Sequence, residues 1–162
     1  TDVKLQQKLH QIFSGTVKLE SGEGITLDKS KAEFIKQKFQ GVKIGIFYIF
    51  KQELVLLQEV FKDHLTTEVE EFNSTDKIIA LQVISGREGI NLSAAKYLVY
   101  YNLSFSALSY YQSRDRMSTM SRLTNQVYYI FSLGGIESKI YKSVMNKKNY
   151  TINKFRSDYV RG

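Results

Sequence analysis

Two polar segments in the middle of the chain carry the residue types that bind phosphate. Residues 85–92 read Ser-Gly-Arg-Glu-Gly-Ile-Asn-Leu, and residues 112–122 contain Gln112, Arg116 and Arg122. Glycines let the backbone approach a phosphate closely, and exposed backbone N–H groups form concavities that bind anions. Gln112 and Arg116 are four residues apart, so on a helix they share one face. The spacing therefore predicts a site for a polyanion.

Each polar segment follows an apolar run with the length and composition of a β-strand. Residues 78–84 precede the first segment, and residues 97–101 precede the second. Residues 42–50 are also nearly continuously apolar, as expected for a strand covered on both faces. Ligands of open parallel sheets bind beyond the carboxyl ends of the strands. The loops after these three strands are therefore predicted to form one edge that carries the site.

The remaining elements follow from hydrophobic periodicity and from turn residues. Five helices are predicted, over residues 3–13, 29–40, 52–64, 107–117 and 137–147. A hairpin is predicted at 16–27 and further strands at 66–72 and 126–131. In the first helix Leu5, Leu9, Ile12 and Phe13 are expected on one side, and Asp28 is expected to cap the second. Strands that alternate with helices predict an α/β fold, a mostly parallel sheet with helices on both faces.

The order of these features resembles the second, C-terminal RecA-like lobe of superfamily 2 helicases. Within that superfamily the likeness is to the Swi/Snf-like DNA helicases and translocases. Gly-Ile-Asn-Leu at 89–92 resembles motif V, and Gln-Ser-Arg-Asp-Arg at 112–116 resembles motif VI. Residues 43–48 resemble the motif IV strand, and residues 131–137 resemble the segment that closes the lobe. The likeness runs from about residue 5 to about residue 148. The short connection between motifs IV and V and the compact tail resemble phage or prophage members of this branch.

The resemblance implies a division of the chain into three parts. Residues 1–41 would form an N-terminal helix, a hairpin and a lead-in helix. Residues 42–148 would form the RecA-like lobe, of the type found in P-loop NTPases, and residues 149–162 a basic C-terminal tail. Family members have a strand and a further helix between motifs IV and V. Because residues 66–72 read as a strand, that helix is expected to be missing here.

The resemblance also implies catalytic roles for three residues. Arg116 matches the first motif VI arginine, an arginine finger, and Gln112 matches the glutamine near the γ-phosphate and the attacking water. An arginine suits this role because phosphoryl transfer spreads negative charge over phosphate oxygens and guanidinium is planar and always charged. Thr119 stands where the family has a second arginine, and Arg122 is the candidate replacement. The alternative is that Arg116 is a surface arginine paired with a nearby carboxylate and that Gln112 is simply solvated.

Motif V residues are implied to contact nucleotide and DNA. Gly89 and Asn91 match positions near the nucleotide, although Asn91 would equally suit the N-cap of a short helix. Hydroxyl, backbone N–H and guanidinium groups hold phosphates without reading sequence. The candidate contacts to the DNA backbone are Ser85, Gly86, Arg87, Lys51 and Gln52.

The chain contains neither the Gly-x-x-x-x-Gly-Lys-Ser/Thr phosphate loop nor an Asp-Glu strand end that would hold a metal. The resemblance therefore implies that ATP and Mg²⁺ are held by an N-terminal RecA-like lobe outside this sequence, and that this lobe alone is inactive. Partners would be that first lobe and duplex or branched DNA, with movement along DNA or strand opening as the outcome. Two alternatives stay open. One is a non-catalytic nucleic-acid-binding module with a degenerate RecA-like fold, which Thr119 favours. The other is a scaffold domain.

Positive charge is concentrated near the C-terminus of the chain. The net charge is +7, and residues 139–162 hold seven basic residues against one acidic residue. This basic stretch is either solvated or a phosphate-contacting patch. Aromatic and apolar side chains at Tyr150, Ile152, Phe155 and Tyr159 are expected to anchor the tail on the lobe.

With no cysteine and two histidines far apart in sequence, disulfides and a histidine-based metal site are not expected. No apolar run has the length of a membrane span. The absence of cysteine suits a reducing cytoplasm, and the resemblance to phage members implies a bacterial or phage-infected host cell.

Overall fold

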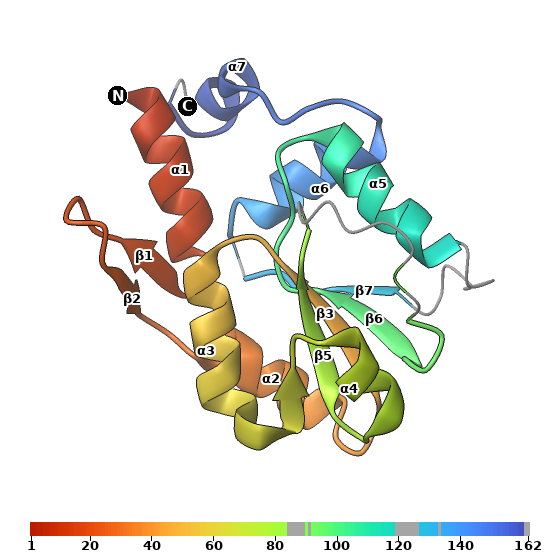
Figure 1. Ribbon diagram of the computed structural model, residues 1–162. Helices are drawn as coiled ribbons and strands as arrows, with labels where there is room; N and C mark the ends of the chain where they lie inside the picture. Colours follow the sequence, from red (N-terminus) through yellow and green to blue (C-terminus); the bar gives the residue numbers. More distant parts are fainter. Residues whose placement is uncertain (84–89, 91, 119–126, 133, 161–162) are drawn as a thin grey trace.

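A five-stranded sheet forms the centre of the computed structural model, which describes residues 1–83, 90, 92–118, 127–132 and 134–160 (Figure 1). Its strands are β3 (Ile44–Tyr48), β4 (Leu65–Thr66), β5 (Ile78–Gln82), β6 (Tyr97–Tyr100) and β7 (Val127–Tyr129). They lie in the order β4-β5-β3-β6-β7, and every neighbouring pair is parallel. The predicted parallel α/β fold is confirmed.

Strand β3 lies in the middle of the sheet because its side chains are apolar on both faces. Ile44, Ile46 and Tyr48 point into one hydrophobic cluster, whereas Phe47 points into the other. Gly45 pairs with Leu98, and a Cβ at this glycine would lie 2.9 Å from the Leu98 side chain. Glycine thus lets Leu98 pack directly across the strand.

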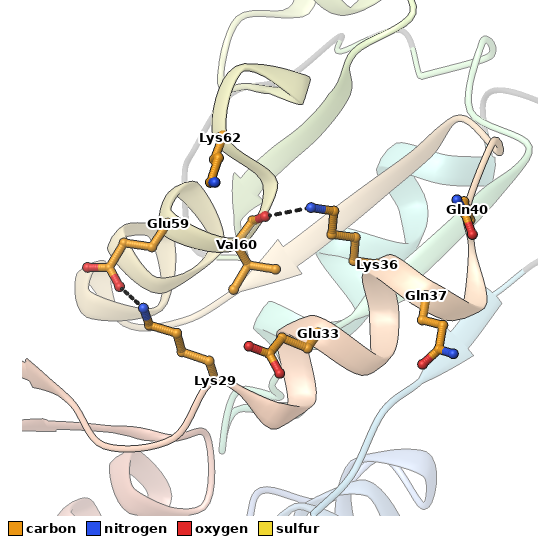
Figure 2. Close-up of a pocket in the computed structure, with 8 residues that line it drawn as sticks. All are labelled: Lys29, Glu33, Lys36, Gln37, Gln40, Glu59, Val60 and Lys62. Carbon is orange, nitrogen blue, oxygen red and sulfur yellow. Dashed lines mark hydrogen bonds and ion pairs between the residues drawn. The ribbon is translucent and has the colours of Figure 1, made fainter.

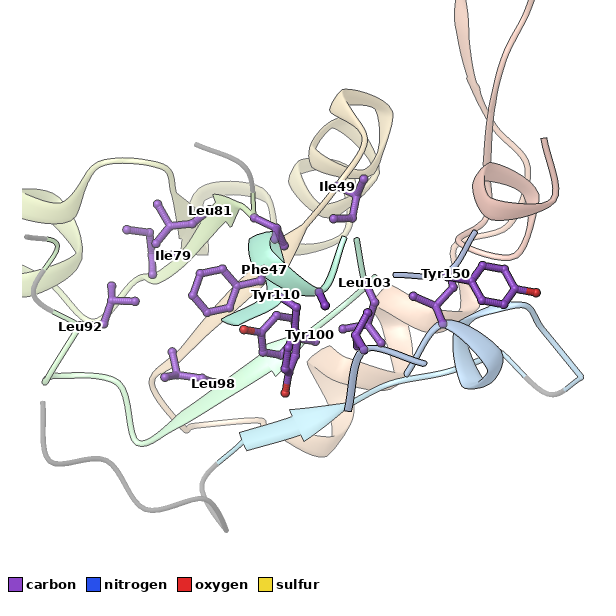
Figure 3. Packing of buried hydrophobic residues seen from close by; sticks show 14 of the residues in the cluster. Phe47, Ile49, Ile79, Leu81, Leu92, Leu98, Tyr100, Leu103, Tyr110 and Tyr150 are labelled. Carbon is purple, nitrogen blue, oxygen red and sulfur yellow. The ribbon is translucent and has the colours of Figure 1, made fainter. Parts of the chain in front are cut away.

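Helices cover both faces of the sheet. On one face α2 (Ser30–Lys38) and α3 (Lys51–Phe61) bury Ala32, Ile35 and Leu57 against the strands. On the other face α4 (Val69–Ser74), α5 (Ala107–Ser118) and α6 (Glu137–Met145) bury side chains that include Phe72, Tyr110 and Ile140. Figure 3 shows Phe47, Tyr100 and Tyr110 packed together in this second cluster.

The two ends of the chain pack against each other. Helix α1 (Asp2–Ile12) is followed by the antiparallel hairpin β1 (Thr16–Lys18) and β2 (Gly24–Thr26). The C-terminal segment forms α7 (Ile152–Phe155) and a π-helical turn, η3 (Arg156–Val160), and α7 lies beside α1 in Figure 1. Arg156 Nε donates to Asp2 Oδ2 at 2.7 Å. Tyr150 and Phe155 are buried, so the predicted anchoring of the tail is confirmed.

The strand predicted at 66–72 is wrong. Only β4 is extended there, and helix α4 follows it, while a 3-10 turn, η1 (Lys62–His64), precedes it. The Thr66 hydroxyl accepts a hydrogen bond from the Glu68 N–H at 3.0 Å and so turns the chain out of the strand. Val69 and Phe72 are three residues apart, which places both on the inner side of a helix. The expectation that a helix is missing between motifs IV and V is therefore also wrong.

The side of α1 predicted to be buried is correct only in part. Leu9 and Phe13 pack against the second hydrophobic cluster as predicted. Leu5 and Ile12 are 45% and 44% exposed, whereas Gln6, His10 and Gln11 are buried. Polar side chains tolerate burial when hydrogen bonds satisfy them, and each of these three has a partner. Asp28 also stands one position earlier than the N-cap, although its Oδ1 still accepts from the Ser30 N–H at 2.8 Å. No helix in the described part of the chain is long and apolar enough to cross a membrane.

Candidate functional site

The carboxyl ends of β3, β5 and β6 meet at one edge of the sheet because the strands are parallel. Lys51 and Gln52 begin α3 directly after β3, and Gln112 and Arg116 lie on α5 after β6. The segment 85–92 connects β5 to β6. The predicted site segments thus all start from this edge, as the sequence indicates. Six of the predicted site residues lie outside the described residues: Ser85, Gly86, Arg87, Gly89, Asn91 and Arg122.

The two predicted residues at the start of α3 differ in their surroundings. Lys51 is exposed. Gln52 is half-buried, and its Nε2 donates to the Thr26 hydroxyl at 3.1 Å. Gln52 also packs on the hairpin so closely that a Cβ at Gly24 would lie 2.2 Å from its Oε1. The side chain of Gln52 therefore fastens the hairpin to α3, and Lys51 is the one presented to solvent.

Helix α5 is anchored at its beginning, which fixes the direction in which the motif VI-like segment leaves the sheet. The Ala107 N–H donates to Asn149 Oδ1 at 2.9 Å, and the Ser106 hydroxyl accepts from the Ser109 N–H at 3.2 Å. Tyr110 is buried, and its hydroxyl is hydrogen-bonded to that of Tyr129. Gln112 lies on the exposed side of the helix, one turn before Arg116. The predicted helix at 107–117 is thus confirmed.

A buried carboxylate joins two of the loops at this edge. Glu53 accepts hydrogen bonds from the N–H groups of Ile49 and Phe50 at 2.8 and 3.0 Å, and from Asn102 Nδ2 at 2.7 Å. Burial raises the pKa of the Glu53 carboxyl, and these hydrogen bonds oppose the rise. Because residues 49–50 follow β3 and Asn102 follows β6, Glu53 holds the two loops together.

His10 extends this arrangement to α1. Its Nε2 lies 2.9 Å from Asn102 Oδ1 and 2.8 Å from the Leu103 carbonyl oxygen, and both atoms are acceptors. Burial lowers the pKa of His10 from 6.5 to about 4, so the ring is neutral at pH 7 with its proton on Nε2. The ring stacks on Phe105, with 4.4 Å between centroids. His10 is thus a structural residue, and the described residues include no group of three or more His, Cys, Asp or Glu that would hold a metal.

A buried ion pair connects α2 to α6 next to the carboxyl end of β6. Lys31 Nζ lies 2.9 Å from Glu137 Oε1 and donates to the Tyr101 carbonyl oxygen at 2.7 Å. The two side chains are 7% and 0% exposed. Glu137 Oε1 also accepts from the Ser132 N–H at 3.3 Å, whereas its Oε2 is buried without a partner among the described atoms. Sequence reasoning identified neither this pair nor Glu53, because no local pattern marks a buried charge.

A groove between α2 and α3 lies at the end of α3 opposite to Lys51 (Figure 2). It has a volume of about 440 Å³ and is lined by both acidic and basic side chains. Lys29 pairs with Glu59 at 2.9 Å, and Lys36 Nζ donates to the Val60 carbonyl oxygen at 3.0 Å. Two of its three lysines are thus engaged, so the groove is a poor match for a phosphate.

No protein-family model matches the chain, and no curated protein matches it. Solved structures do match it. The C-terminal part of the Fun30 ATPase domain aligns with a TM-score of 0.55 and 21% identity over 74% of this chain and 45% of that one. The Sulfolobus solfataricus SWI2/SNF2 ATPase core in complex with dsDNA aligns with a TM-score of 0.59 and 18% identity. That alignment covers 99% of this chain and 38% of the other. A second structure of the Sulfolobus solfataricus core domain gives 0.61 and 20%, over 98% and 36%.

The fold is RecA-like. The likeness extends over nearly the whole chain for both Sulfolobus solfataricus structures, so α1, the hairpin and the C-terminal segment lie within the aligned part. The chain spans less than half the length of each of these solved chains. The predicted RecA-like fold is confirmed. The strand that resembles motif IV is β3, and the segments that resemble motifs V and VI follow β5 and β6 along the chain.

Proposed function

We propose that this chain is the second motor lobe of an ATP-dependent DNA helicase or translocase of the Swi/Snf-like branch. The observation that carries the proposal is the position of α5. The segment that resembles motif VI lies on α5, the helix that follows β6 in a RecA-like sheet, and β6 pairs with β3, the strand that resembles motif IV. The likeness to ATPase cores, one of them bound to dsDNA, supports the same assignment.

In this proposal the chain supplies positive charge to ATP that another lobe holds. Arg116 would stabilise the charge on the γ-phosphate oxygens, Gln112 would orient the attacking water, and Arg122 would take the place of the second arginine. Gly89 and Asn91 would lie next to the nucleotide. The sequence contains neither a phosphate loop nor an Asp-Glu strand end, so both the phosphate loop and the ligands of Mg²⁺ would come from a first lobe.

The DNA backbone would follow the same edge of the sheet. Ser85, Gly86 and Arg87 would contact phosphates from the loop after β5, and Lys51 from the start of α3. Gln52 is hydrogen-bonded to the hairpin, so it would not contact DNA directly. It would instead help to hold α3, the helix that carries Lys51, in place. Glu53 and Asn102 support this role because they hold the loops after β3 and β6 in a fixed relation.

A second candidate function is a non-catalytic nucleic-acid-binding module with a degenerate RecA-like fold. Thr119, where the family has its second arginine, favours it. The two functions share the DNA surface and differ in whether Arg116 affects ATP turnover. The phage type and the cytoplasmic location stay predictions.

The DNA surface is tested by the salt dependence of binding to a labelled duplex. Each phosphate contact adds about 0.9 to the slope of log affinity against log salt concentration, because it releases condensed counterions. Replacing Arg87 by alanine is expected to lower this slope by about one and to weaken binding to all sequences alike. Lys18→Ala on the hairpin is the control and should leave the slope unchanged. An unchanged slope for Arg87→Ala would contradict the assigned DNA path.

A further inference from the structure

A hollow of about 510 Å³ separates α6 from the C-terminal segment. Four lysines line it: Lys139 and Lys142 from α6, Lys148 from the loop after α6, and Lys154 from α7. Lys139 and Lys142 are three residues apart on the helix and share a face. The lining includes a single carboxylate, that of Asp158. The hollow is therefore strongly positive and open to solvent.

Ser143 fixes two of the four lysines. Its buried hydroxyl accepts a hydrogen bond from Lys154 Nζ at 2.7 Å. The same hydroxyl faces the carbonyl oxygens of Lys148 and Asn149 at 3.1 and 3.0 Å, and the Lys148 N–H donates to the Ser143 carbonyl oxygen at 3.1 Å. Lys147 takes the left-handed backbone conformation that this tight turn requires, with φ of 58°. The loop that carries Lys148 and the side chain of Lys154 are thus preorganised.

The far wall of the hollow is also held in place. Tyr150 is buried, and its N–H donates to the Phe105 carbonyl oxygen at 2.8 Å. Its hydroxyl donates to Asp158 Oδ2 at 2.9 Å, and burial together with this carboxylate raises the pKa of Tyr150. The carboxylate of Asp158, the one acidic side chain of the lining, is therefore already hydrogen-bonded to the Tyr150 hydroxyl. Phe155, buried on the adjoining turn, fastens α7 to the second hydrophobic cluster.

Three of the four lysines of the hollow are available to a ligand. The ion pairs among the described residues involve Lys29, Lys31, Lys77 and Arg156, and none of the four lysines of the hollow. Lys139, Lys142 and Lys148 are exposed. Several ammonium groups that line one hollow beside a single engaged carboxylate suit a phosphate group, which is compact and carries its charge on several oxygens.

We propose that this hollow is a phosphate-binding site that takes a backbone phosphate of DNA. The DNA part rests on the proposed function, since a motor lobe that follows a duplex meets many phosphates. The hollow is formed by α6 and the C-terminal segment, whereas the proposed path at the sheet edge uses Lys51 and the loop after β5. The duplex would then contact the lobe at two separate places.

The test uses the 162-residue chain, a fluorescein-labelled duplex and binding titrations at several salt concentrations. The variant Lys139→Gln/Lys142→Gln should lower the salt slope by about one to two, because each lost phosphate contact lowers it by about 0.9. The matched control is Lys18→Gln/Lys62→Gln, which removes the same charge from the hairpin and the end of α3. Equal slopes for the two double variants would overturn the site and leave the proposed function standing.

Two further measurements separate the site from the function. Ser143→Ala removes the hydroxyl that holds Lys154 and the 148–149 turn, and should lower the slope by about one while thermal unfolding stays cooperative. An NMR titration with inorganic phosphate should shift the amide signals of Lys148 and Lys154 before others. If the wild-type chain binds no duplex DNA, the proposed function fails. Shifts confined to the hollow would then support the phosphate site, and their absence would overturn it.

Discussion

Replacing Arg116 by alanine is expected to lower DNA-stimulated ATP turnover about 10³-fold or more in a protein that joins this chain to a phosphate-loop lobe. The guanidinium would stabilise charge that develops only in the transition state, so its loss lowers the rate of the chemical step. Binding of duplex DNA should change much less, because Arg116 is assigned to ATP. Steady-state turnover at saturating ATP and DNA, with DNA affinity measured alongside, gives both numbers.

Two variants sharpen this result. Arg116→Lys keeps the charge but loses the planar fork, and should remain strongly impaired. Lys38→Ala removes a cation from the last turn of α2, far along the chain from α5, and should leave turnover unchanged. Turnover within a few-fold of wild type for Arg116→Ala would remove the basis for a motor lobe and favour the non-catalytic nucleic-acid-binding module.

Replacing Lys31 by methionine is expected to lower the free energy of unfolding by about 3–5 kcal/mol, the usual cost of removing one partner from a buried ion pair. Glu137 is fully buried and its Oε2 already has no described partner, so the lost ammonium would leave its carboxylate without charge compensation. The same substitution removes the hydrogen bond to the Tyr101 carbonyl oxygen. Urea denaturation of both proteins at pH 7 measures the difference.

Lys29→Met is the matched control for this variant. Lys29 pairs with Glu59 at the same 2.9 Å, but those side chains are 46% and 43% exposed. Exposed pairs are worth about 0–1 kcal/mol, so the control should be close to wild type. The double variant Lys31→Met/Glu137→Leu removes both charges and should recover much of the lost stability. Equal, small effects of Lys31→Met and Lys29→Met would show that the buried pair contributes little.

The sequence predicted the sheet well because its strands carry a strong local signal. The residues of β3 and β6 are almost all apolar, which leaves no other way to bury them than a covered parallel sheet. Helix α5 and the sheet edge from which it starts followed from the same reasoning. The prediction of a strand at residues 66–72 was wrong because a short stretch of alternating residues fits both a strand and one turn of helix. The hydrogen bond from the Glu68 N–H to the Thr66 hydroxyl and the burial of Phe72 favour the helix there.

The supporting contacts of the candidate site were beyond sequence reasoning because they join distant residues. His10 and Asn102 are 92 residues apart, and Lys31 and Glu137 are 106 apart. A buried polar residue has no periodic pattern of its own, so the burial of Gln6, His10 and Gln11 on α1 was not predicted. For the site itself, the sequence predicted the strands that its segments follow, and the phosphate-binding role of those segments stays a prediction, because the side-chain geometry of the arginines follows from no local pattern.

The most direct test of the motor-lobe assignment is ATP turnover with saturating duplex DNA, measured for the chain alone and for the chain joined to a phosphate-loop lobe of a SWI2/SNF2 ATPase. The chain alone is expected to show no measurable turnover, because it has no phosphate loop of its own. The joined protein is expected to hydrolyse ATP in a DNA-stimulated manner. DNA-stimulated turnover by the chain alone, or none by the correctly folded joined protein, would contradict the assignment.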